Sequence, residues 1–503
     1  MDPEHGGHLS VFAEQRASRS STVAPVLLPG PGRRTDVWLN ATPNPDTSKD
    51  PEVWGAHQKT TYDKSGKITR IQAWGDENRS NPIVDTTYCY IADTTAGGTC
   101  AANEANDRDK LQWSKDNTTN QADSGLVTEY GYKSDDDAPT DRLTSVTQTG
   151  GSKPTNWKFT YDDAGNRTRA LATDVASGDV KTDTKFSFNA VGQITTAGYQ
   201  YDGTGNMTAA PGETFTYNGA QHMTASTKDG VKTSYTYAGA DMNKLLSQAT
   251  DGGKAYQYTY GTSDRNGVPV ITARTVAGVG TASVLSDPAS GRPLDLRTTD
   301  GTTSMWVIDG IGNPAAAITD KGAKAYVVSY SPYGGETVSY GDTSAQWQQN
   351  PYGFKGGIRS SSTSNGLTKF GYRWQTAKTG TWTERDTLDA PLSPSNANRY
   401  SYAGGDPINL SDSTGRVAGV KYLDEVIGGV ITGQQLDQAV GTGDSKQVAQ
   451  AVTGEIVGTA VSATCAGVTA SLTGGAALVA VGGCFAAGEI AGSYASTGKA
   501  PWQ

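Results

Sequence analysis

The sequence is short of large aliphatic side chains and of net charge. Leu, Ile, Val and Phe make up roughly 15% of the residues, a level that raises the question of disorder. Disordered chains combine such a composition with high net charge, whereas 42 basic and 51 acidic residues leave only −9 over 503 residues here. The 24 Tyr and 10 Trp supply large packing surfaces. The composition therefore predicts a folded protein, and its slight acidity argues against nucleic acid as a partner.

Cysteine and histidine are equally scarce. The four cysteines form two local pairs, Cys89 with Cys100 and Cys465 with Cys484, and neither pair has the spacing of metal ligands. The four histidines lie far from them in the sequence: His5, His8, His57 and His222. We therefore expect no metal site and no cofactor. Each cysteine pair closes a short loop, which suits a disulfide and an oxidising destination; two buried thiol pairs are the alternative.

A hydrophobic leader is also lacking. Residues Met1 to Arg19 are charged and polar, without the apolar central region of a signal peptide. The chain is therefore expected either to be exported by another route or to be the C-terminal part of a longer gene product.

What the sequence does contain is an internal repeat. Three octets share the pattern Tyr-Asp-x-x-Gly-x-x-Thr, namely Tyr62–Thr69, Tyr161–Thr168 and Tyr201–Thr208. Weaker copies begin at Phe188, Tyr217 and Tyr237. Large and hydroxylated side chains alternate before the turn, as in residues 158–161, which is the period of a strand with one buried face. The repeat therefore predicts one hairpin per copy.

The Asp-x-x-Gly part of each octet has the chemistry of a tight turn. Asp accepts hydrogen bonds from backbone N–H groups ahead of it, and Gly adopts the positive φ that the turn requires. Tyr suits the strand because its ring packs while its hydroxyl can remain in water. We therefore predict an all-β fold, in which a long antiparallel sheet curls to bury one face.

The octets resemble the Tyr-Asp (YD) repeats of the Rhs family, and residues 306–415 are similar to the repeat-associated core domain of that family. The matching signatures keep the family's order: Asp309–Asn313, Tyr330–Gly334, Asn350–Gly356, Lys369–Arg373, Trp382–Asp386 and Asn398–Asn409. The resemblance implies repeats that spiral into a hollow β-shell, closed by the core domain, which encloses a C-terminal polypeptide. Such shells usually contain more repeats, so the chain is interpreted either as a whole shell or as only its closing part.

The resemblance and the changes of composition divide the chain into four expected parts. These are an irregular segment 1–55, the repeat shell 56–300, the core domain 301–416 and a variable Gly- and Ala-rich helical segment 417–503. Before residue 417, few bulky aliphatics and many Tyr, Thr and Ser suit a sheet that is wetted on both faces, as in a hollow vessel.

Core domains of the Rhs family can cut their own chain with two aspartates and a supporting arginine. By motif match these are Asp386, Asp412 and Arg373, and the cut would follow Arg416. Two carboxylates that share a proton could activate water and polarise the carbonyl group of the bond. The chain departs from the family pattern at Ser413, where the family has proline, and at Arg416, where it has leucine. Turn caps and ion pairs that close the shell are the alternative, and no other catalysis is expected.

The composition changes after Arg416. Aromatic residues nearly disappear, and residues 456–488 contain no charged side chain. Runs of small residues such as Gly474–Gly483 are typical of closely packed helices. A hairpin that inserts into membranes and a helical cargo or plug inside the shell are both open, and Ser and Thr dilute the hydrophobicity enough to favour the plug. A catalytic toxin is least favoured, because the segment has no His and few charged residues.

Two functions from different classes follow. In the first, the chain is a shell that encloses, presents or delivers its C-terminal segment in competition between bacteria or in contact with a host. Its partners are then the segment as cargo and an immunity protein. In the second, it is a surface module without toxin activity, whose Tyr and Trp side chains bind glycans or a neighbouring cell. Both functions imply a secreted, cell-surface or wall-associated location.

Overall fold

The computed structural model describes residues 34–421, with gaps at 43–44, 46–48, 92–93, 101–109, 120, 240, 265, 288–290, 362–365, 388–396 and 417–419. The chain divides into two compact units, residues 1–426 and 427–503. The second unit lies outside the described residues. The predicted helices of segment 417–503, its charge-free part 456–488, and Cys465 and Cys484 therefore also lie outside them.

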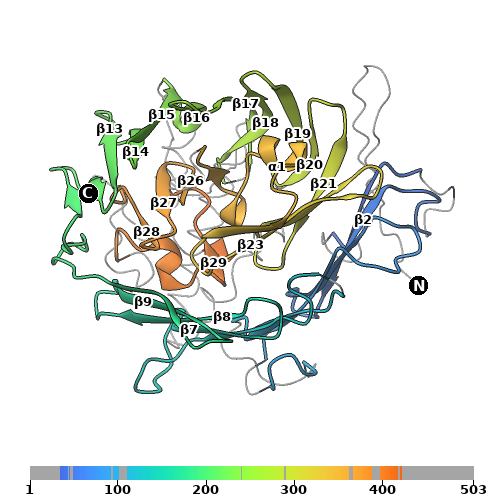
Figure 1. Ribbon diagram of the computed structural model, residues 1–503, viewed down its shortest axis with the longest axis horizontal. Coiled ribbons are helices and arrows are strands. Elements are labelled where there is room, and N and C mark those ends of the chain that lie inside the picture. The colour runs from blue at the N-terminus through green and yellow to red at the C-terminus, as the bar shows by residue number, and fades with distance from the viewer. Residues whose placement is uncertain are drawn as a thin grey trace, which may run out of the picture. The chain divides into compact units, whose positions relative to one another are not determined.

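The described residues form two large and two small antiparallel sheets (Figure 1). The first large sheet has ten strands, paired in chain order: β1 (Asp36–Leu39), β2 (Ala56–Tyr62), β3 (Ile68–Trp74), β4 (Val84–Cys89), β5 (Trp113–Asp116), β6 (Val127–Gly131), β7 (Ser145–Thr149), β8 (Thr155–Tyr161), β9 (Arg167–Asp174) and β10 (Val180–Lys185). The second has fourteen, also in chain order: β11 (Gln200–Tyr201), β12 (Met207–Ala210), β13 (Glu213–Tyr217), β14 (Met223–Lys228), β15 (Val231–Ala238), β16 (Asp241–Thr250), β17 (Ala255–Ser263), β18 (Pro269–Val276), β19 (Gly280–Ser286), β20 (Pro293–Arg297), β21 (Thr303–Ile308), β22 (Pro314–Thr319), β23 (Lys324–Tyr330) and β24 (Glu336–Tyr340).

The small sheets come from the last part of the described chain. They contain β25 (Ile358–Arg359), β26 (Leu367–Phe370), β27 (Arg373–Thr376) and β28 (Thr381–Trp382) in one, and β29 (Leu410–Ser411) and β30 (Val420–Lys421) in the other. The helical elements are α1 (Ala345–Gln349), η1 (Phe354–Gly356) and η2 (Tyr402–Gly405). None of the helices in the described part of the chain is long and apolar enough to cross a membrane. The prediction of an all-β fold is confirmed.

Each repeat forms a hairpin because its Asp closes the turn. Asp63, Asp162 and Asp202 each accept, through Oδ1, the backbone N–H four residues ahead at 2.9 Å. The glycine three residues after each Asp has a φ of 94°, 77° and 96° respectively, which a side chain would disfavour. The turn chemistry predicted from the octets is therefore present in all three.

The repeat tyrosine marks a β-bulge. The pairing register shifts directly before it in five hairpins, at Tyr62, Tyr161, Tyr201, Tyr217 and Tyr237. In four of these hairpins the hydroxyl donates to a backbone carbonyl earlier in the chain, Tyr62 to Arg34, Tyr161 to Leu143, Tyr217 to Met207 and Tyr237 to Met223. Burial raises the pKa of Tyr161, Tyr217 and Tyr237 well above its ordinary value. The expectation that these hydroxyls remain in water is therefore wrong for these three, because the bulge aims the side chain inward.

The inner faces of the large sheets pack on the core segment, residues 345–411. Phe215 and Tyr235 of the second sheet share one hydrophobic cluster with Trp347 and Trp374, and the rings of Tyr235 and Trp374 lie 4.6 Å apart. Figure 1 shows β26–β28 on the inner side of the large sheets. The inner face is thus dry where the core segment covers it. The composition had instead suggested a sheet that is wetted on both faces. Aromatic rings take the place of the scarce aliphatics.

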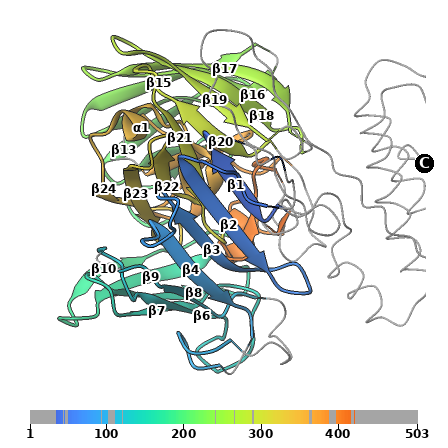
Figure 2. The ribbon, with the colours of Figure 1, turned by 90° about the vertical axis from the view of Figure 1, so that its right-hand side faces the viewer.

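The first strands of the first large sheet lie against strands near the end of the second. Leu39 and Ile71 of the first sheet lie in one hydrophobic cluster with Val307 and Ile318 of the second, and Figure 2 shows β1–β3 beside β20–β22. Strand β1 corrects the prediction of an irregular segment 1–55, because the burial of its Leu39 stabilises a strand there. The predicted boundary between residues 300 and 301 lies inside the second sheet, where β20 and β21 pair.

Candidate functional site

A buried guanidinium group brings the three residues of the predicted self-cleavage site together. Arg373 begins β27, whose four residues are all buried. Its Nη2 lies 2.7 Å from Asp386 Oδ2 and 3.1 Å from Asp412 Oδ2. Arg373 is 5%, Asp386 9% and Asp412 0% exposed, so the ion pairs are shielded from water. Because both carboxylates contact one nitrogen atom, they lie on the same side of the guanidinium.

The other atoms of Arg373 bind the backbone of the segments that carry the aspartates. Nε donates to the carbonyl oxygen of Gly415, and Nη1 donates to that of Arg399 at 3.3 Å. The guanidinium also lies 4.2 Å from the ring centroid of Trp382. Burial lowers the pKa of Arg373, and the neighbouring carboxylates oppose this shift. Arg373 thus joins the strand after Gly371, the segment around Asp386 and the end of the core.

The turn 412–416 shares two hydrogen bonds with the repeat turns. Gly415 N–H donates to the carbonyl oxygen of Asp412 at 3.3 Å, and Arg416 N–H donates to Asp412 Oδ1 at 3.1 Å. Tyr372 N–H donates to the carbonyl oxygen of Thr414 at 3.0 Å. The segment at which the predicted tail begins is therefore fixed against β27.

Glu384 is a third carboxyl group beside this site, and the sequence prediction missed it. It is 3% exposed, and its Oε2 accepts from Trp374 N–H at 2.9 Å and from Thr383 Oγ1 at 2.8 Å. Burial raises its pKa to about 7, and Arg373 and Lys369 act against that shift. The signal available in the sequence is its position two residues before Asp386, next to a strand.

A cavity of about 120 Å³ lies against the turn 412–416. Ser413 and Gly371 line it on one side, and Tyr260, Ile271 and Tyr352 line it on another. This volume exceeds the roughly 10 to 15 Å³ that a cavity needs in order to hold one water molecule. The surroundings of the turn therefore have room for small molecules such as water.

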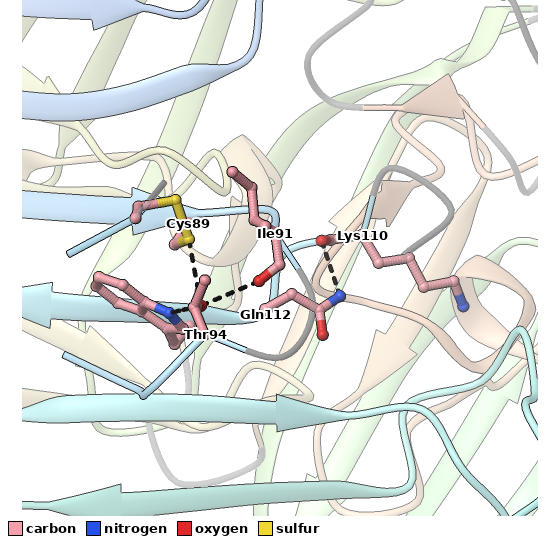
Figure 3. Close-up of a disulfide and its surroundings, with 7 residues drawn as sticks. Cys89, Ile91, Thr94, Lys110 and Gln112 are labelled. Atoms are coloured by element: carbon pink, nitrogen blue, oxygen red, sulfur yellow. Dashed lines mark hydrogen bonds between the residues drawn. A yellow bond between two sulfur atoms is a disulfide. The ribbon is translucent and has the colours of Figure 1, made fainter. Parts of the chain in front are cut away.

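The structure joins Cys89 and Cys100 in a disulfide (Figure 3). Cys89, at the end of β4, is fully buried, and its sulfur lies 3.7 Å from Thr94 Oγ1. That hydroxyl accepts a hydrogen bond from Trp113 Nε1 at 2.8 Å. The disulfide thus lies at the end of β4 and the start of β5, where Thr94 connects it to Trp113.

Potential metal ligands do not cluster in the part of the chain that the structure describes. Groups of three or more His, Cys, Asp or Glu with the geometry to hold a metal ion are absent there. Of the described histidines, His57 stacks on Trp38 with ring centroids 4.9 Å apart, and its Nε2 lies 2.9 Å from Asp36 Oδ1.

Comparison with known proteins identifies the fold. Residues 96–408, more than half of the 503 residues, match the family model of the teneurin YD-shell. The chain belongs to the teneurin YD-shell family. The YD-repeat shell predicted from the octets is therefore confirmed. No curated protein matches the sequence of this YD-shell at a significant level.

Several solved structures have a similar fold at low sequence identity. A crystal structure of TcdB2–TccC3–Cdc42 superimposes with a TM-score of 0.54 at 15% identity, covering 78% of this YD-shell and 20% of that chain. A Photorhabdus luminescens Tc holotoxin pore gives a TM-score of 0.55 at 14% identity, covering 79% and 19%. A TcdB2–TccC3 structure without its hypervariable C-terminal region gives 0.52 at 15% identity, covering 76% and 20%. The YD-shell thus spans about a fifth of the length of these chains.

Proposed function

We propose that residues 34–416 form a shell that carries the C-terminal segment 417–503 and presents or delivers it, in competition between bacteria or in contact with a host. One structure of similar fold is described as a Tc holotoxin pore, and another was solved without a hypervariable C-terminal region. A carrier of this kind would act outside the cell that makes it, so the proposal includes a secreted or cell-surface location. The segment is the proposed cargo.

One observation carries this proposal: the start of the segment is anchored in the core. Gly415 is buried, and its carbonyl oxygen accepts a hydrogen bond from Arg373. A Cβ atom on Gly371 would overlap the carbonyl oxygen of Thr414, so these two backbones are in direct contact. A tail attached at this point begins at a fixed place beside β27. This is what a carrier needs in order to position its cargo.

The same place holds the proposed self-cleavage site. Asp386 and Asp412 would act on the chain near Arg416, with Arg373 as the cation that supports them. One carboxylate would accept a proton from water while the other would supply a proton to the leaving nitrogen. Hydrolysis there would break the covalent link between the shell and the cargo.

Growth and vesicle-leakage measurements test the proposal. Producing the full chain in bacterial cells is expected to inhibit growth, whereas producing residues 1–416 alone is not. Rescue by a co-produced protein that binds the segment would identify an immunity protein. If both chains are equally harmless to bacterial and animal cells, the delivery role is lost.

Leakage of dye from vesicles on addition of the full chain would assign the segment 456–488 to membranes, and the absence of leakage would favour the plug.

The alternative of a glycan-binding surface module has less support from the described residues. Among their exposed large hydrophobic side chains Tyr340, at 50% exposure, is the one aromatic. Glycan sites usually present several exposed aromatic faces, whereas Trp38, Trp74 and Trp306 of the large sheets are buried in clusters. Saturable binding of the full chain to a glycan array would reverse this preference.

A further inference from the structure

The geometry points to Gly415–Arg416 as the peptide bond that the site hydrolyses, one residue before the bond that the family pattern indicates. This inference rests on the proposed self-cleavage and specifies its substrate. The family pattern places the cut after Arg416. In the structure, the carbonyl oxygen and the nitrogen of the preceding bond, Gly415–Arg416, each contact a side chain that hydrolysis requires.

The carbonyl oxygen of this bond is hydrogen-bonded to the guanidinium of Arg373. Nε of Arg373 donates to the carbonyl oxygen of Gly415, while Nη2 of the same guanidinium contacts Asp386 and Asp412. Attack by water turns this carbonyl oxygen into an oxyanion, and a fixed cation in a buried site stabilises such a charge. Asp386 shares the guanidinium with the carbonyl, so a water held by Asp386 is close to the carbon atom under attack.

The nitrogen of the bond is hydrogen-bonded to the second aspartate, Asp412. Arg416 N–H donates to Asp412 Oδ1 at 3.1 Å, and Asp412 Oδ2 contacts Arg373 Nη2 at 3.1 Å. The step consumes one water molecule. Its oxygen bonds to the Gly415 carbon, one proton passes to Asp386, and the C–N bond breaks. The two carboxyl groups start with one proton between them, on Asp412. Asp412 gives this proton to the Arg416 nitrogen, and the proton that Asp386 took from water then passes to Asp412, so the pair ends as it began and no oxidant or further reactant is needed.

A repeat turn provides the internal comparison. At residues 202–206 the same turn forms, with Gly205 N–H on the carbonyl oxygen of Asp202 at 3.1 Å and Asn206 N–H on Asp202 Oδ1 at 2.9 Å. There the Gly205 carbonyl accepts from the hydroxyl of Tyr400 at 2.7 Å. A neutral phenol replaces the guanidinium and its two carboxylates. Turn geometry alone is therefore common in this protein, and the charged surroundings distinguish Gly415.

The two residues of the bond fit their positions. Gly415 has a φ of 65°, and a Cβ atom there would overlap the carbonyl oxygen of Phe370, so glycine is required before the bond. Arg416 is exposed, and its guanidinium lies 3.7 Å from the ring centroid of Tyr372. A charged side chain after the bond is thus accommodated on the surface. An arginine would fit poorly in a buried apolar subsite for the leucine of the family pattern, but such a subsite matters only if the cut follows residue 416.

The test is the N-terminal sequence of the released fragment. The purified full chain is incubated, and intact mass and N-terminal sequencing are recorded over time. A fragment that begins at Arg416 supports the inference. A fragment that begins at Val417 overturns it while leaving self-cleavage intact, and a chain that stays whole overturns both.

Three variants sharpen this test. Asp386→Asn, close in shape to the native residue, is expected to slow cleavage at least about 100-fold, and thermal unfolding shows whether it is folded. Asp202→Asn alters the matching repeat turn and is expected to leave cleavage unchanged. Arg416→Leu restores the residue of the family pattern, and the cut is expected to remain after Gly415. A shift to the bond after residue 416 in this variant would show that the side chain, and not the backbone geometry, selects the bond.

Discussion

Gly75 and Gly322 lie so close together that a Cβ atom on either would overlap the carbonyl oxygen of the other. Gly75 follows β3 of the first large sheet, and Gly322 lies in the turn between β22 and β23 of the second. Gly55 approaches the carbonyl oxygen of Asp320 in the same way. Because these neighbours are backbone atoms, no side chain can rotate aside. Glycine is therefore required where the two sheets meet.

Replacing Gly75 by alanine is expected to destabilise the protein by about 1 to 3 kcal/mol, the usual cost of overpacking. The added methyl group would push the turn at Gly322 away from the first sheet. Gly219→Ala is the matched control, because a Cβ atom there meets no other atom within 4 Å. Thermal unfolding of the two variants is the measurement. Equal melting temperatures would show that the sheets do not depend on this contact.

This contact shows where the sequence could predict the fold and where it could not. The octets predict hairpins because Asp, Gly and the alternating strand residues act within a few positions of one another. They carry no information on how residues 75 and 322, far apart in the chain, come together. The burial of the tyrosine hydroxyls was missed for a related reason, since the acceptors of Tyr161 and Tyr217 are carbonyl groups 18 and 10 residues earlier in the chain.

The stability of the protein is expected to rise on acidification through the protonation of Glu384. Burial raises its pKa from 4.5 to about 7, so between these values the folded state binds a proton that the unfolded state does not. The contribution is fully present below pH 4.5 and is lost as the pH rises through about 7. It amounts to about 3 kcal/mol. His222 acts in the opposite direction, because burial lowers its pKa from 6.5 to about 4, and its contribution is lost as the pH falls below 6.5.

The variant Glu384→Gln isolates this contribution, because glutamine stays neutral at every pH. Denaturant unfolding at pH 5 and at pH 8 gives the change in stability for the wild type and for the variant. The variant is expected to lose less stability than the wild type between these two conditions. Glu129→Gln, at an exposed position in β6, is the control. An unaltered pH dependence in Glu384→Gln would show that this carboxyl group keeps its ordinary titration in the folded protein.

The site was predictable in its members but not in its geometry. Arg373, Asp386 and Asp412 are found by motif because the core signatures retain their order in the sequence. Which carbonyl group the arginine meets depends on how β27 approaches the turn 412–416, which no local pattern encodes. Glu384 was missed because an acidic residue beside a strand reads as exposed until the fold covers it.

Reduction of the disulfide between Cys89 and Cys100 is expected to cost about 2 to 4 kcal/mol of stability, as for other short loops. The measurement is the melting temperature with and without reductant, for the wild type and for the double variant Cys89→Ser, Cys100→Ser. The variant lacks this disulfide, so reductant is expected to affect it less than the wild type. Peptide mapping without reduction is expected to recover the two cysteines in one linked peptide, and two separate alkylated peptides would contradict the pairing.

Removing a single repeat hydroxyl is expected to weaken the contact between neighbouring hairpins. Tyr217, which is partly buried, donates to the carbonyl oxygen of Met207 at 2.8 Å. Tyr217→Phe keeps the ring and leaves that carbonyl without this donor, at a cost of about 1 to 3 kcal/mol. Tyr340→Phe is the control, since Tyr340 is 50% exposed and water can replace its hydrogen bonds. Denaturant unfolding of both variants decides the point: if Tyr217→Phe is as stable as Tyr340→Phe, the repeat tyrosines stabilise the sheet through their rings alone.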